Sequence, residues 1–162
     1  MTPTRWLTPH EQRTWRAFLE ATRRLDEQLD RDLLREAGLP LAYYLILAML
    51  SEAPERTLRM RDLAGATWSS RSRLSHAIDR LEQNGWVRRV NCPSDKRGAF
   101  AVLTDAGLEV LVAAAPGHVA SVRRHVFDLL TPQEAAVLGK ISDTIAAHLR
   151  SDEAAWSSLA AE

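Results

Sequence analysis

Apolar positions near the N-terminus repeat every three to four residues, the period of an amphipathic α-helix. Thr8, Pro9 and Glu11 precede the repeat as a cap, a first-turn proline and the acidic partner of a capping box. Gly38 and Pro40 provide a stop signal. The pattern predicts one long helix, whose apolar stripe consists of Trp15, Phe18, Leu19, Leu25, Leu29 and Leu33.

Two shorter helices are predicted after this first one. Residues 41–52 are apolar on nearly every side, which is typical of a helix buried in a core. Pro54 ends that helix. Residues 58–66 predict a short helix that turns Leu63 and Ala64 inward.

The next helix has two chemically different faces. Ser69 and Ser70 supply its cap, and Gly85 stops it after Asn84. Its inward stripe is apolar and consists of Leu74, Ala77, Ile78 and Leu81. Its other face is polar and basic and carries Arg71, Ser72, Arg73, Ser75, His76 and Arg80. A short helix, a turn and a second helix of this kind form a helix-turn-helix unit, whose second helix can lie in a DNA major groove.

A short hairpin is predicted directly after the helix-turn-helix unit. Residues 86–91 and 99–103 are expected to form its strands, and 92–98 form a polar loop with turn residues at both ends. A hairpin in this place is a wing. The chain is therefore predicted to be mainly α with a small antiparallel β-hairpin wing.

Two further amphipathic helices complete the chain. Residues 104–105 cap the first, which the Pro-Gly pair at 116–117 should kink or interrupt before 119–130. Residues 131–134 repeat the opening capping box and begin the second, with apolar positions Ala135, Leu138, Ile141, Ile145 and Leu149. The stripes at both ends of the chain cannot all be covered by a small winged-helix core, so they predict a two-fold interface.

Charge is concentrated in the middle of the chain, although the formal net charge of the whole is +0. Residues 56–100 hold ten Lys or Arg and four Asp or Glu, which gives this stretch +6 and leaves −6 for the rest. A basic middle is expected of a lobe that binds a polyanion. On charge alone, a basic face that contacts only solvent is equally compatible.

Particular side chains of this basic region suit DNA contacts. Arg71 and Arg73 lie in the first helical turn, where each could donate two hydrogen bonds to a guanine. Arg97, near the hairpin tip, could enter a narrow minor groove, braced by Asp95. Arg88 and Arg89 alternate on a strand, so only one is expected to face DNA. The candidate DNA-binding residues are Ser69, Ser70, Arg71, Ser72, Arg73, Ser75, His76, Arg80, Arg88, Asp95, Lys96 and Arg97.

Four segments together resemble the MarR (multiple antibiotic resistance regulator) family. They are Leu-Ala at 63–64, SRLSHAIDRLEQNG at 72–85, Asp-Lys-Arg-Gly at 95–98 and Leu-Thr-Asp-Ala-Gly at 103–107. A D-x-R wing followed at this spacing by L-T-x-x-G is hard to obtain by chance. The flanking helices match in order and length.

The resemblance implies a single domain over 1–162 that acts as a homodimer. Its dimerisation helices would be 8–37 and 105–160, on either side of a winged helix-turn-helix DNA-binding lobe at 40–104. It further implies repression at a pseudo-palindromic operator on double-stranded DNA, relieved by a small phenolic or anionic effector. Candidate effector-binding residues are Trp15, Tyr43, Tyr44, Trp68 and His118, although such aromatic residues are more often ordinary core.

The composition excludes several other classes of protein. Charges interrupt every apolar run, so no membrane span is predicted. Cys92 is the only cysteine, which excludes an internal disulfide and suits the cytoplasm; an inert thiol is favoured over a redox sensor. The histidines show no zinc-like spacing, and neither a metal nor a cofactor is expected.

Two other functions are open to a chain with a winged-helix unit, an enzyme and a protein-binding adaptor. Some methyltransferases carry winged-helix appendages, but they need a glycine-rich nucleotide-binding domain that this chain has no length for. No catalytic constellation is visible either, so an enzyme is not expected. A protein-binding adaptor with a winged-helix fold should present an apolar or acidic helix face, whereas this face is basic and rich in serine.

Overall fold

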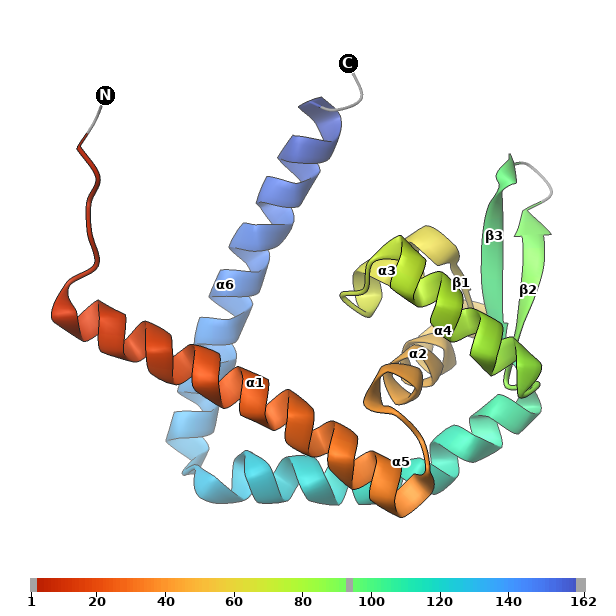
Figure 1. Ribbon diagram of the computed structural model, residues 1–162, viewed down its shortest axis with the longest axis horizontal. Helices are drawn as coiled ribbons and strands as arrows, with labels where there is room; N and C mark the ends of the chain where they lie inside the picture. Colours follow the sequence, from red (N-terminus) through yellow and green to blue (C-terminus); the bar gives the residue numbers. More distant parts are fainter. Residues whose placement is uncertain (1–2, 93–94, 160–162) are drawn as a thin grey trace. The chain divides into compact units, whose positions relative to one another are not determined.

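The computed structural model describes residues 3–92 and 95–159, with side chains described for 3–91 and 98–150. Two compact units divide the chain, one ending at Ser121 and the other beginning at Val122. The elements are α1 (Pro9–Ala37), α2 (Leu41–Glu52), a 3-10 turn (Pro54–Arg56), β1 (Thr57–Arg59), α3 (Met60–Ala66), α4 (Arg71–Gln83), β2 (Val87–Cys92), β3 (Asp95–Leu103), α5 (Asp105–His125), a second 3-10 turn (Phe127–Leu129) and α6 (Pro132–Leu159). Figure 1 labels the α-helices and the strands. The predicted fold class, mainly α with a small antiparallel wing, is confirmed.

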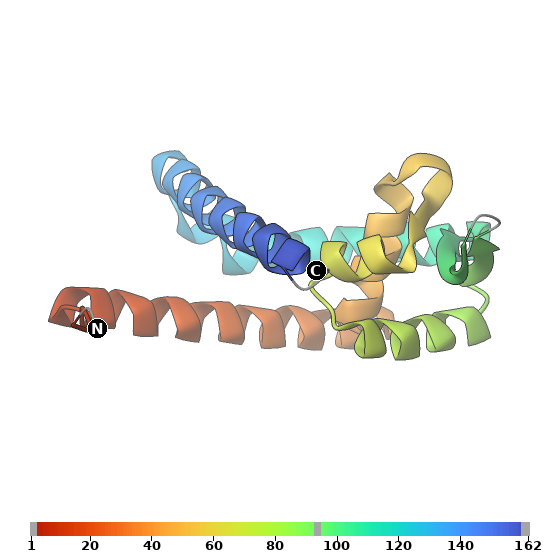
Figure 2. The same cartoon turned by 90° about the horizontal axis from the view of Figure 1, so that it is seen from above.

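Helix α1 begins and ends as its sequence predicts. The Thr8 hydroxyl accepts a hydrogen bond from the Glu11 amide, and the Glu11 carboxylate accepts one from the Thr8 amide, so the capping box is complete. Gly38 takes the left-handed conformation, with φ of 63°, and ends the helix. Figure 2 shows α1 as one straight rod.

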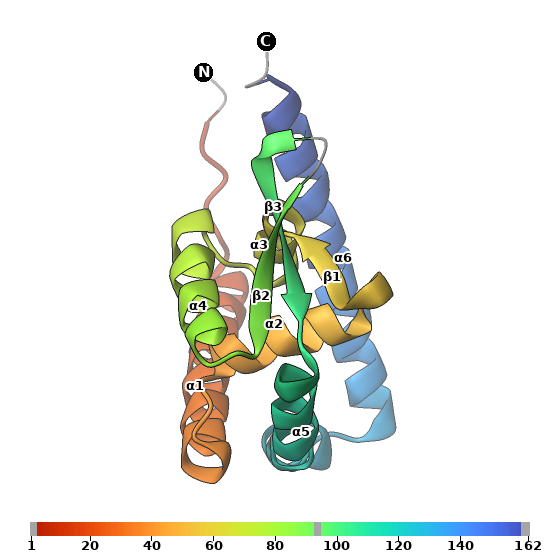
Figure 3. The same ribbon diagram turned by 90° about the vertical axis from the view of Figure 1, so that its right-hand side faces the viewer.

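The sheet has one more strand than the predicted hairpin. Segment 58–66 is not helical throughout, because Thr57–Arg59 forms β1 and only Met60–Ala66 is α3. The strand order is β1-β3-β2, antiparallel at both pairings (Figure 3). The hairpin is also longer than predicted, because 92 belongs to β2 and 95–98 to β3 rather than to a loop.

Most of the hydrophobic core lies in the segment from α2 to β3, which we call the winged-helix lobe (41–103). Leu33, Leu39, Leu111 and Ala114 extend the core on either side of it. Ile46, Leu47 and Leu50 of α2 are essentially inaccessible to solvent, which explains why that helix is apolar on nearly every side. Leu63 and Ala64 of α3 are buried as predicted, and so are Leu74, Ile78 and Leu81 of α4. These side chains fix α3 and α4 against α2 and the sheet.

Thr104 and Gly107 join the wing to α5. The Thr104 hydroxyl accepts a hydrogen bond from the Gly107 amide and donates one to the Gly85 carbonyl, at 3.0 and 2.7 Å. A Cβ at position 107 would lie 2.1 Å from the Trp86 carbonyl oxygen, so only glycine fits here. The L-T-x-x-G motif therefore has a structural cause, the close contact between the first turn of α5 and the start of β2.

Helix α5 continues through Pro116, so of the two predicted outcomes, a kink or an interruption, the interruption is wrong. Figure 1 shows the helix bent but unbroken. Pro116 lies on the exposed side, and Val112, whose carbonyl loses its helical partner, is 62% exposed. Water can therefore form the hydrogen bond that the Val112 carbonyl loses, so the helix continues past the proline. The helix ends at His125 rather than near residue 130.

In the second unit, α6 opens on the predicted capping box. The Glu134 carboxylate accepts hydrogen bonds from the Thr131 amide and hydroxyl, both at 2.8 Å. Among the described residues no single helix is long and apolar enough to cross a membrane. Only α1 and α2 taken together, bent by 84° at their break, meet that test of length and composition.

Candidate nucleic-acid interface

Helix α4 separates a buried apolar face from an exposed basic one. Arg71, Ser72, Arg73, His76 and Arg80 are all exposed, opposite the buried stripe of the same helix. The side chains described in the structure place no ion-pair partner beside Arg71 or Arg73. Among the described side chains, the Arg80 guanidinium donates only to the neutral side-chain oxygen of Gln83, at 3.2 Å. The cations of this face are therefore available to an external anion.

The serines around the start of α4 have different surroundings. Ser70 is the N-cap, and its hydroxyl accepts a hydrogen bond from the Arg73 amide at 3.3 Å. Ser69 is half-buried and its hydroxyl donates to the Thr67 carbonyl. Ser72 is exposed. Ser75 is half-buried and faces the wing rather than solvent, because it binds Arg89.

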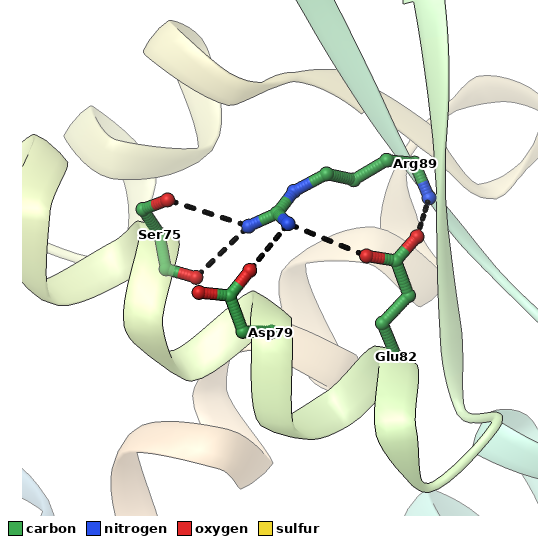
Figure 4. A network of polar contacts seen from close by, with 4 residues as sticks. All are labelled: Ser75, Asp79, Glu82 and Arg89. Carbon is green, nitrogen blue, oxygen red and sulfur yellow. Dashed lines mark hydrogen bonds and ion pairs between the residues drawn. The ribbon is translucent and has the colours of Figure 1, made fainter.

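Arg89 of β2 joins the wing to α4 (Figure 4). Its guanidinium forms ion pairs with Asp79 and Glu82 and donates to the Ser75 carbonyl at 2.9 Å. The Arg89 amide donates to the Glu82 carboxylate at 2.6 Å. Three successive turns of α4 are thus held by one side chain of the neighbouring strand. Sequence spacing could not indicate this cluster, because its members lie seven to fourteen residues apart.

Arg88, the neighbour of Arg89, is exposed on the other face of β2. The strand therefore directs one arginine to solvent and the other to α4. The predicted contacts of Asp95, Lys96 and Arg97 lie outside the described side chains, as does the thiol of Cys92; the structure gives only their backbone, in β3 and β2.

Two of the candidate effector residues meet at the contact between α2 and α5. The rings of Tyr44 and His118 lie 4.4 Å apart between centroids, tilted by 42°. Burial lowers the pKa of His118, and burial followed by the Glu52 charge raises the pKa of Tyr44. His118 Nδ1 is buried without a hydrogen-bond partner among the described residues. Such an atom is costly to leave unsatisfied.

A buried carboxylate also joins α1 to α5. Asp32 is 2% exposed and accepts hydrogen bonds from the Ser121 hydroxyl at 2.5 Å and from the side-chain amide of Gln28 at 2.9 Å. Arg35 forms an ion pair with the same carboxylate at 2.9 Å. This cluster fixes the C-terminal half of α1 against α5.

The other three effector candidates lie elsewhere. Tyr43 is half-buried and lines an open groove between α2 and α4, together with Arg73, His76 and Arg80. Trp15 is 50% exposed on α1, stacked on Phe18. Trp68 is 84% exposed in the turn before α4. Of the five, the structure brings only Tyr44 and His118 into ring contact.

Known proteins are similar to this chain in both sequence and architecture. A family model described as MarR family matches residues 37–98. Sco3205, a MarR family transcriptional regulator from Streptomyces coelicolor solved in complex with DNA, is 56% identical, with a TM-score of 0.83 over 88% of this chain and 90% of that one. AbsC, another MarR family transcriptional regulator from that organism, is 53% identical, with a TM-score of 0.83 over 91% of this chain and 99% of that one.

A curated relative extends the likeness beyond Streptomyces. YkoM, named an HTH-type transcriptional regulator of Bacillus subtilis, is 28% identical over 120 residues, which are 74% of this chain and 75% of that protein. The predicted class, a regulator rather than an enzyme, is confirmed by these relatives. The chain belongs to the MarR family of transcriptional regulators.

Proposed function

We propose that this regulator is a homodimer that represses transcription from a pseudo-palindromic operator in the cytoplasm. One α4 from each chain enters a major groove, and each wing contacts the neighbouring minor groove through Arg97. The observation that carries the proposal is the exposed face of α4, where Arg71, Arg73 and Arg80 lack acidic partners among the described residues. The DNA complex of Sco3205 supports the choice of ligand.

Dimerisation is supported by apolar side chains that the single chain leaves in solvent. On α6, the side chains of Val137, Leu138, Ile141, Ile145 and Leu149 are 40 to 56% exposed and recur at helical spacing. We call them the α6 stripe. On α1, Trp15, Phe18 and Leu19 are 44 to 50% exposed and form the α1 stripe. Monomers rarely leave such rows exposed, and a second copy of the chain would cover them.

Competition binding tests the proposed base contacts. Arg71→Ala or Arg73→Ala removes a guanidinium that can donate two hydrogen bonds to one guanine. At least one variant should lose about 1–3 kcal/mol of discrimination at a single base pair, with little change on scrambled DNA. The probes are duplexes from the region upstream of the protein's own gene and scrambled duplexes at fixed salt. Arg23→Ala is the control, because that side chain is 83% exposed on α1.

The outcome separates a regulator from an adaptor. A regulator binds the upstream duplexes in a salt-dependent way, and its base preference depends on α4. If the base preference is unchanged in both arginine variants, α4 contacts the phosphates and recognises the shape of the DNA rather than its base edges. No salt-dependent binding to any duplex would contradict the proposed function.

Release by a small phenolic or anionic effector is supported by the unpartnered His118 Nδ1 beside Tyr44. A phenol or acid could donate a hydrogen bond to that nitrogen. A phenolic acid such as 4-hydroxybenzoate should then weaken DNA binding by the wild type but not by His118→Phe. Equal release of both proteins would place the effector elsewhere.

A further inference from the structure

Trp68 is an exception within the winged-helix lobe. Over its described side chains, 41–91 and 98–103, it is the one large apolar residue that is exposed, at 84%. The comparable residues around it, such as Leu63 and Leu74, are buried. Removing an exposed indole from water is favourable, so a partner outside the chain that covered this ring would gain free energy.

The backbone at Trp68 is one that glycine would adopt more easily. Its φ is +49°, in the left-handed region. The Trp68 amide donates to the Gly65 carbonyl and the Ser69 amide to the Ala64 carbonyl, which together form a Schellman motif at the end of α3. Glycine is the usual residue at this position. Trp68 thus adds backbone strain and an exposed apolar ring without contributing to the core.

The surroundings of Trp68 point to the partner. Ser70, two residues later, caps α4, and Arg71 and Arg73 follow in its first turn. Among these described neighbours there is no carboxylate, and both guanidinium groups are exposed. An indole beside unpaired cations suits a surface that is anionic but has apolar parts. The deoxyribose-phosphate backbone of DNA has both.

We propose that Trp68 is a DNA-binding residue that lies against the sugar-phosphate backbone at the edge of the groove entered by α4. Its ring covers a deoxyribose, and its Nε1–H donates to a phosphate oxygen. This inference rests on the proposed function. Because the contact is to the backbone, Trp68 contributes affinity for every DNA sequence and does not select bases.

Trp68→Gly tests the inference because it should weaken DNA binding without destabilising the fold. The midpoint of urea unfolding should stay or rise, since glycine relieves the left-handed strain. The affinity for a labelled duplex of mixed sequence should fall by about tenfold, and the affinity for upstream DNA by the same factor. Trp6→Gly is the matched control, because that indole is 83% exposed and lies before α1.

Salt dependence separates Trp68 from the arginines. Trp68→Gly should leave the slope of log K against log salt unchanged, because an indole displaces no counterion. Arg73→Ala should make the slope shallower by about two if each Arg73 of the dimer contacts a phosphate. A second readout is acrylamide quenching, in which DNA should protect an emission component of the wild type that Trp68→Phe lacks.

Several results would overturn the inference. Wild-type affinity in Trp68→Gly, or equal quenching of wild type and Trp68→Phe on DNA, would show that the indole does not contact DNA. A weaker dimer in Trp68→Gly, with DNA affinity per dimer unchanged, would assign the ring to a second copy of the chain. If the wild type itself fails to bind any duplex, the proposed function fails first.

Discussion

The winged-helix lobe and the terminal helices carry apolar residues at the same helical spacing but in opposite surroundings. In the lobe, Leu47, Leu74 and Ile78 are at most 1% exposed. On α1 and α6, Leu19 and Ile141 are 46% and 51% exposed. The lobe completes its core within one chain. The α1 and α6 stripes need a surface that a single chain does not supply, which is the physical basis for proposing a dimer.

Leu47→Ala should have the largest effect, because it removes a fully buried side chain from the centre of the lobe. The free energy of unfolding is expected to fall by about 2–5 kcal/mol, measured by urea denaturation. The dimer dissociation constant of the folded protein should not change. A loss of stability below about 1 kcal/mol would mean that the lobe repacks freely around the substitution. The lobe would then not have the closely packed core that distinguishes it from the terminal helices.

Ile141→Ala tests the other side of the comparison. If the α6 stripe is a dimer interface, each dimer loses two side chains and about 2–4 kcal/mol of association free energy. Sedimentation equilibrium should show a dissociation constant raised by at least about tenfold. Asp143→Ala, an exposed position on the other side of α6, is the control. Equal dissociation constants for wild type and Ile141→Ala would exclude this stripe from the interface.

Arg88 and Arg89 allow a comparison within the lobe itself. Arg89→Ala leaves Asp79 and Glu82 without their shared cation and should cost about 1–3 kcal/mol of stability. The lost connection between wing and α4 should also weaken DNA binding. Arg88→Ala should change stability by no more than about 0.5 kcal/mol, because its side chain is exposed. Thermal unfolding of both variants measures the two losses of stability. Identical stabilities of the two variants would mean that the Arg89 cluster does not hold the wing against α4.

The smallest expected effect is a pH dependence from His118. Burial lowers the pKa of His118 in the folded chain, so the unfolded chain binds its proton first as the pH falls. The stability that the neutral ring contributes is present above the unfolded pKa, about 6.5, and is lost below it. His118→Gln should therefore lose less stability than wild type between pH 7.5 and 5.5. Parallel loss in both proteins would contradict this.

Much of the fold was predictable because its signals are local. The capping boxes at Thr8 and Thr131 lie within four residues, and so does the Ser70 cap of α4. Strand β1 was missed because three residues carry little pattern and their partner, Val102 to Phe100, lies far along the chain. Asp30 was also missed: its carboxylate accepts a hydrogen bond from the Leu41 amide, 11 residues away, and so caps α2 from α1.

The candidate site shows the same limit. Its exposed cations on α4 followed from helical spacing, since the buried stripe fixes which residues face outward. The diversion of Ser75 to Arg89 did not, because it depends on how β2 packs against α4. The groove position of Tyr43 and the ring contact of Tyr44 also depend on tertiary packing. Sequence pattern determines which side of a helix is exposed, but not which distant side chain lies there.

The mass of the protein–DNA complex tests the central claim most directly. Light scattering or native mass spectrometry would be applied to the protein alone and to its complex with an upstream duplex. A homodimeric regulator should have twice the 18.1 kDa chain mass when free, and should place two chains on one duplex whose half-sites lie about one helical turn apart. A monomer at micromolar concentration that binds the duplex as one chain would contradict it.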